Sequence, residues 1–85
     1  MKWWKLAAEQ GTADAQNNLG VMYGNGLGVP QDYIRAHMWW NIAASSGYKE
    51  AVSGRNAISK GMTPAEISTA QKLARECVRK KCKGC

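Results

Sequence analysis

The residues best suited to chemistry are three cysteines near the carboxyl end of the sequence, Cys77, Cys82 and Cys85. A structural zinc site needs four ligands, commonly from two Cys-x2-Cys pairs or from cysteines and histidines together. Only one such pair is present, and the sole histidine, His37, belongs to a different predicted helix. We therefore expect no metal site and no cofactor.

In an oxidising compartment these cysteines favour a disulfide from Cys77 to Cys85 or to Cys82. Either pairing would pin the tail against the last helix and leave one thiol over. In a reducing cytosol all three would remain thiols.

The sequence also lacks a visible catalytic arrangement. His37 has no Ser, Cys or Asp at an evident triad relation, so we interpret it as a surface or partly buried structural histidine. The glycines of segment 24–28 superficially suggest a phosphate loop, but they follow a helix and lack the Gly-Lys-Ser/Thr ending. We predict no catalytic residues and a protein that is not an enzyme.

The formal net charge of +6 is concentrated at the carboxyl end. Six cations lie in the last part of the chain: Lys72, Arg75, Arg79, Lys80, Lys81 and Lys83. Such a tail can attract nucleic acid or an acidic partner. It can also be a solvated helix end whose cations favour the negative pole of the helix dipole. No aromatic residue interleaves the charges, which favours the second interpretation.

Helices alone are predicted to position these residues. Apolar residues recur at three- and four-residue steps, and no alternation typical of a strand is present. Asp32 is an expected N-cap, and Thr63-Pro64-Ala65-Glu66 combines a capping box with a first-position proline. The predicted helices are one ending near Gln10, then 13–23, one from Asp32 that Gly47 closes, 49–59, and one from Pro64 to about Lys80.

The tryptophans occur as two adjacent pairs. Because neighbouring helical residues point about 100° apart, only one tryptophan of each pair can lie on the stripe of apolar and small residues that faces the helix-packing core. Trp4 and Trp40 fit that stripe, and for Trp39 packing in the core is the favoured role. Small residues such as Gly20 and Ala44 should let helices approach closely, so enlarging either would overpack the contact.

The stretch from Trp3 to Ala15 reappears from Trp39 to Ala51, displaced by 36 residues (from 4 to 40). A period of this length is the signature of a repeat array.

The ordering of small and apolar residues resembles the Sel-one-like repeat, a relative of the tetratricopeptide repeat. The resemblance covers Trp3 to Ala51, with one complete repeat after the second helix of a truncated one. The stretch from Gly61 to Glu76 is similar to the closing helix often seen in bacterial members, which favours a bacterial source. The residues that carry the resemblance are Ala15, Gln16, Leu19, Gly20, Tyr23, Gly26, Gly28, Val29, Asp32, Ala36, Trp39, Trp40, Ala43, Ala44, Gly47 and Ala51.

This resemblance implies an all-α fold, an α/α solenoid of antiparallel helix pairs with about 1.5 repeats and a C-terminal capping helix. The chain 1–85 would form a single domain. Its expected parts are a half repeat (1–11), a full repeat (12–47), the first helix of a degenerate repeat (48–60) and the capping helix (63–81).

The resemblance implies a non-catalytic scaffold that binds a protein or peptide on its concave face. Matching the chain to the first helix of each repeat suggests the residues that line this face: Asp14, Asn17, Val21, Glu50, Ser53 and Ala57. The alternative function is a small nucleic-acid-binding protein that uses the basic tail.

The first helix is expected to lack its usual partner. Trp3, Trp4 and Leu6 would then present an apolar face, whereas terminal repeats ordinarily need a polar outer surface. We therefore predict a homo-oligomer through this helix. No secretory signal or membrane span is recognisable, so we expect a cytoplasmic protein, or a periplasmic or secreted one if the sequence is a fragment of a longer exported chain.

Overall fold

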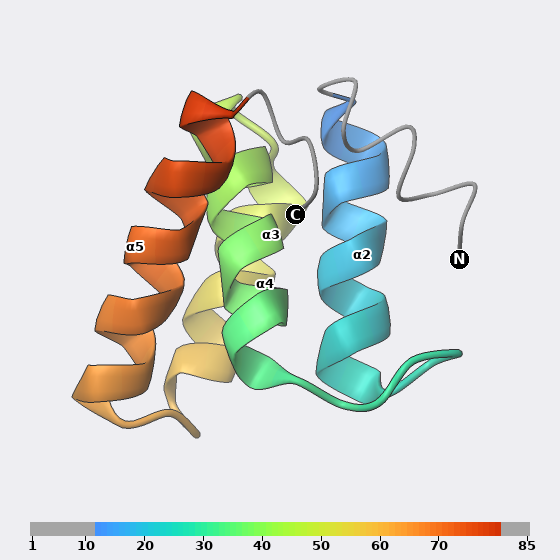
Figure 1. Ribbon diagram of the computed structural model, residues 1–85. Coiled ribbons are helices and arrows are strands. Elements are labelled where there is room, and N and C mark those ends of the chain that lie inside the picture. The colour runs from blue at the N-terminus through green and yellow to red at the C-terminus, as the bar shows by residue number, and fades with distance from the viewer. Residues whose placement is uncertain (1–11, 81–85) are drawn as a thin grey trace.

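The computed structural model describes residues 12–80. They form four helices, α2 (Ala13–Asn25), α3 (Tyr33–Ser45), α4 (Lys49–Ser59) and α5 (Pro64–Arg79), with no strand in this part of the chain (Figure 1). The predicted all-α class is confirmed. The helix predicted to end near Gln10 lies outside the described residues.

Local signals set the helix ends. The Oδ1 atom of Asp32 accepts a hydrogen bond of 3.1 Å from the backbone N–H of Arg35, and both hydrogen bonds of the Thr63–Glu66 capping box are present. Helix α2 continues past the predicted end at residue 23, because the chain first turns left-handed at Gly26, with φ of 68°. Thr12 occupies the N-cap of α2 but makes no capping hydrogen bond with its side chain.

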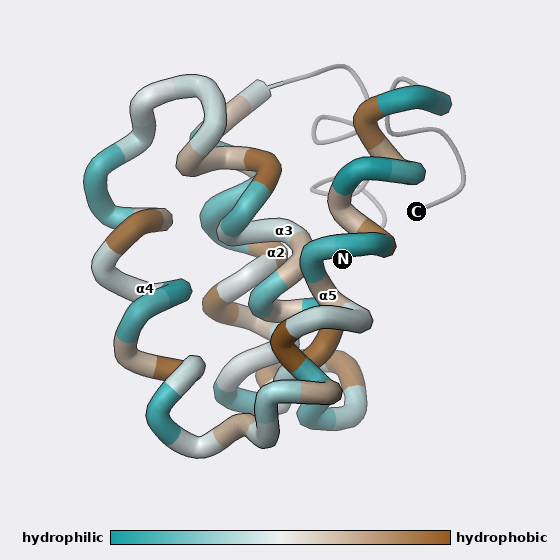
Figure 2. The backbone as a smooth tube through the Cα atoms, turned by 90° about the vertical axis from the view of Figure 1, so that its left-hand side faces the viewer, coloured by the Kyte–Doolittle hydropathy of each residue, from teal (hydrophilic) through white to brown (hydrophobic). Residues whose placement is uncertain are grey.

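Helix α3 lies at the centre, and α4 and α5 flank it on different sides (Figures 1 and 2). Helices joined by short connections commonly pack as antiparallel neighbours, but α5 packs on α3 rather than on α4. The composition of α4 explains this difference, since Ala51 is its only buried residue. By contrast, α5 buries Ala70, Ala74 and Cys77.

Trp40 fills the contact of α3 with α2 and α4. A Cβ atom at Gly20 would lie 2.6 Å from Nε1 of Trp40, and one at Gly54 would lie 2.6 Å from its Cε2. Both neighbouring helices therefore approach the indole with bare backbone, which only glycine permits. Ala36, Ala43 and Ala51 complete this cluster.

Trp39 fills a second cluster, between α2 and α5. It is only 1% exposed and packs among Leu19 of α2 and Ala74 and Cys77 of α5. Packing in the core, the favoured role for Trp39, is confirmed. The two adjacent tryptophans thus bind α3 to three helices at once.

Candidate protein-interaction surface

The six residues expected on the concave face lie on α2 and α4, which pack against each other. On each helix they stand at spacings of three and four residues, so each set shares one side. Val21 packs on the cluster around Trp40 and Ala51, which brings the α2 set beside α4. We call this surface the α2–α4 face; Asp14, Glu50, Ser53 and Ala57 are exposed on it, and Asn17 and Val21 are partly buried.

One end of the α2–α4 face is acidic. The side chain of Asp14 on α2 is hydrogen-bonded to the hydroxyl of Tyr48, the N-cap residue of α4. This hydrogen bond raises the pKa of Tyr48, and desolvation and then the charges of Asp14 and Glu50 raise it further. Tyr48 was not predicted from the sequence, because nothing local to residue 48 indicates a partner on α2.

The other end is a pocket of about 250 Å³ with a mixed polar and apolar lining. The indole of Trp40 lines this pocket together with Gly24 and Gly54. Among the six residues predicted for the concave face, only Ala57 lines it. Its lining residues are Gly24, Asn25, Tyr33, Trp40, Gly54, Ala57 and Ile58. Gly54 could have indicated this site from the sequence, since a glycine inside a predicted helix often marks a place where another part of the chain packs closely on the helix backbone.

His37 is buried at 1% exposure and connects α3 to α4. Its Nε2 lies 3.0 Å from Oγ of Ser59, and Nδ2 of Asn41 lies 3.0 Å from its Nδ1. The expectation of a surface or partly buried ring was wrong, because Ser59 supplies a partner from 22 positions along the chain. The structural role fits these contacts.

The contacts also fix the protonation of His37. Arg55 donates to Oδ1 of Asn41 (3.1 Å), so the Asn41 amide must present its N–H group to Nδ1. The Nδ1 atom therefore accepts, and Nε2–H donates to Ser59, whose hydroxyl donates to the carbonyl of Arg55 (2.7 Å). Burial, and secondarily the charge of Arg55, lower the pKa of His37. The imidazole is held neutral as a helix-to-helix connector.

Other predicted sites are only partly within the described residues. Cys77 is buried in the contact of α5 with α3 and is disulfide-bonded, whereas Cys82 and Cys85 lie outside residues 12–80, so the choice of partner stays a prediction. The self-association residues Trp3, Trp4 and Leu6 also lie outside.

Between residues 12 and 80, no cluster of three or more His, Cys, Asp or Glu side chains could hold a metal ion. In the same part of the chain, no helix combines the length and apolar character needed to cross a bilayer.

Antiparallel helices with a repeated Trp-Trp signature define a helical repeat protein, a class that works through extended surfaces. The Sel1 repeat matches residues 1–12 and 13–48, more than half of the sequence, and the chain belongs to the Sel1 repeat family. The resemblance to the Sel-one-like repeat is thereby confirmed. Sel1 repeats are generally non-catalytic modules that mediate protein–protein interaction.

A curated relative is the chitin synthase regulator SKT5 of the fungus Malassezia restricta, which is 38% identical over 68 residues. The match covers 80% of this chain and 5% of the relative. The chain thus spans a small part of that protein. Since this relative is fungal, it lends no support to the expected bacterial source.

Proposed function

We propose that this chain is a non-catalytic interaction module that binds an extended peptide or loop of a protein partner along the α2–α4 face. The observation that carries the proposal is the layout of that face. A strip of residues from two neighbouring helices, exposed at Asp14, Glu50, Ser53 and Ala57, runs from the acidic end at Asp14 to the pocket lined by Trp40.

The pocket supports binding of one apolar side chain. At about 250 Å³ it is smaller than typical small-molecule sites, which occupy roughly 300–1,000 Å³. Tyr33 and Trp40 both line the pocket, and Tyr33, which is 40% exposed, is the more accessible of the two rings. An aromatic or branched aliphatic residue of the partner would bury apolar area there.

Polar groups support orientation of the bound segment. Asp14 and Glu50 add negative charge at the far end of the face. We therefore expect the partner segment to carry a basic residue at a distance from its apolar anchor.

The experiment is a pull-down from the native host with identification by mass spectrometry, followed by calorimetry with the purified partner. We expect Ala57→Trp, which fills the mouth of the pocket, to weaken binding about tenfold or more. Glu50→Lys should weaken it less and in a salt-dependent way. Ala65→Trp is the matched control, because Ala65 is also an exposed helical alanine but lies on α5.

Unchanged affinity in both α2–α4 variants, with circular dichroism showing intact helices, would exclude this face. Binding of nucleic acid through the basic tail is the competing function. Its affinity would fall steeply with salt, in proportion to the phosphates contacted, and would be insensitive to Ala57→Trp.

A further inference from the structure

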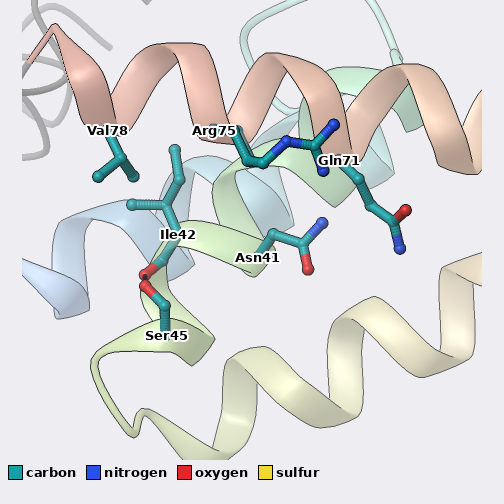
Figure 3. A pocket seen from close by; sticks show the side chains of 7 residues that line it. Asn41, Ile42, Ser45, Gln71, Arg75 and Val78 are labelled. Carbon is teal, nitrogen blue, oxygen red and sulfur yellow. Dashed lines mark hydrogen bonds between the residues drawn. The ribbon is translucent and has the colours of Figure 1, made fainter.

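A second concave surface lies on the other side of α4. It is an open groove of about 620 Å³. Helix α3 contributes three of its lining residues and α5 contributes four (Figure 3). We call it the α3–α5 groove; it is lined by Asn41, Ile42, Ser45, Gln71, Ala74, Arg75 and Val78.

The groove exists because α4 and α5 diverge. Each packs on α3, but they do not pack closely on each other, which leaves one side of α3 uncovered between them. Figure 3 shows the side chains of α3 and α5 pointing into this space, with α4 passing along its far side. None of these residues belongs to the α2–α4 face, so the two surfaces can be tested separately.

The groove has an apolar end. Val78, a large apolar residue, is 53% exposed there, and Ile42 and Ala74 lie beside it. Ile42 and Ala74 belong to the Trp39 cluster, so this end is backed by the packed core. It offers a firm apolar platform rather than a mobile surface side chain.

The opposite end is polar and positively charged. Asn41, Gln71 and Arg75 lie together at this end in Figure 3. The guanidinium of Arg55 approaches the same place from α4, since it donates to Oδ1 of Asn41 (3.1 Å). Arg75 thus lines this end of the groove, and Arg55 of α4 reaches its edge at Asn41.

No acidic side chain of residues 12–80 balances this charge. Asp14 and Glu50 lie by Tyr48 on the α2–α4 face. Asp32 caps α3 and pairs with Arg35 (3.4 Å), and Glu66 completes the capping box of α5. Glu76 lines a different cavity, with Lys80 and Thr69. The charge of the groove is complementary to an anion.

We propose that the α3–α5 groove binds an acidic segment of a protein partner, with a carboxylate between Arg75 and Arg55 and an adjacent apolar side chain over Ile42, Ala74 and Val78. Arginine suits this role, because its planar guanidinium can hold a carboxylate through two parallel hydrogen bonds. The apolar platform selects for an apolar residue beside the acid, which charge alone would not do. This surface is distinct from the α2–α4 face and does not depend on the function proposed for it.

The test measures the binding of defined peptide and oligonucleotide probes to the full chain by nuclear magnetic resonance. The probe is an end-blocked octapeptide of alternating Leu and Glu, and the comparison probes are Ser-Glu and Leu-Lys octapeptides and a thymidine oligonucleotide. We expect the Leu-Glu peptide to bind most tightly, with shift changes at Asn41, Gln71, Arg75 and Val78. The amides of the α2–α4 face should be unaffected.

Substitutions locate the contact. Arg75→Glu should weaken binding of the Leu-Glu peptide about tenfold or more, and Arg75→Gln should weaken it less. Lys60→Glu makes the same change in net charge at an exposed site at the end of α4, so it should change affinity less than about threefold. Arg75 is exposed, and circular dichroism checks that its variants remain folded.

Three outcomes would overturn the proposal. Equal weakening by Arg75→Glu and Lys60→Glu would indicate general charge attraction. Equal affinity for Ser-Glu and Leu-Glu peptides would exclude the apolar platform. Preferential binding of the oligonucleotide would assign the groove to phosphate instead.

Discussion

Trp39 and Trp40 are neighbours in α3, yet they are packed in different ways. Trp40 lies against the backbone of two helices, at Gly20 and Gly54, where no side chain separates the indole from the chain. Trp39 lies among side chains of α2 and α5, including Leu19 and Ala74. Side chains can adjust by changing rotamer and helix backbone cannot, so the contact at Trp40 should be the stricter of the two.

Both tryptophans leave a buried indole N–H group without a hydrogen-bond partner among residues 12–80. A buried donor without a partner costs about 1–3 kcal/mol. Both tryptophans are therefore placed for their size and shape rather than for their polar atom.

The largest expected effect is that of Trp39→Ala. Removing a fully buried tryptophan from a core typically costs about 3–5 kcal/mol, and Trp39 is 1% exposed. Urea unfolding should show most of the stability of the domain lost. The control is Leu73→Ala on α5, where the side chain is 37% exposed and the loss should stay below about 1 kcal/mol. Equal losses at both positions would mean that α5 does not pack on Trp39 in solution.

Gly54→Ala should give the next largest effect and should depend on Trp40 alone. Its Cβ atom would lie 2.6 Å from Cε2 of Trp40, so we expect a loss of about 1–3 kcal/mol. In a Trp40→Leu background the alanine should become favourable, because alanine exceeds glycine in helix propensity by about 1 kcal/mol. In a Trp39→Leu background the loss should persist.

A matched glycine serves as the control for this cycle. A Cβ atom at Gly61 would lie 3.7 Å from the ring of Tyr33, an ordinary contact, so Gly61→Ala should be nearly neutral. If Gly54→Ala were equally harmful in both tryptophan backgrounds, the contrast between the two sites would fail.

A smaller effect concerns pH and distinguishes the two sides of α3. Because burial lowers the pKa of His37 below its ordinary value of 6.5, the unfolded chain binds more protons as the pH falls below 6.5. The stability supplied by the neutral ring is complete above pH 6.5 and is lost as the pH falls toward the lowered pKa. The hydrogen-exchange protection factors of α4 should therefore fall more than those of α5 between pH 7 and 5. His37→Gln should abolish that difference, and its persistence would assign the effect to another group.

The sequence predicts the local parts of this fold well. Asp32 and Thr63 cap their helices as expected, because a cap depends on residues three positions apart. The different directions of Trp39 and Trp40, about 100° apart, follow equally from helix geometry. Such features can be predicted without knowing which helices pack against each other.

Features that depend on distant partners were not predictable. The burial of His37 requires Ser59, and the role of Tyr48 requires Asp14 on another helix. The position of α5 on α3 depends on how little apolar surface α4 offers, which single-helix periodicity does not reveal. The α3–α5 groove is a product of that placement and was missed for the same reason.

The contact between Trp40 and two glycines constrains how this sequence can drift over generations. At the Trp39 site, a substitution that makes one neighbouring side chain smaller can be compensated by a second that makes another side chain larger. This site can therefore change through successive single substitutions. At the Trp40 site any added side chain at Gly20 or Gly54 meets the indole at once. These three positions are therefore mutationally interlocked, and lineages that keep the fold should retain them together or replace them together.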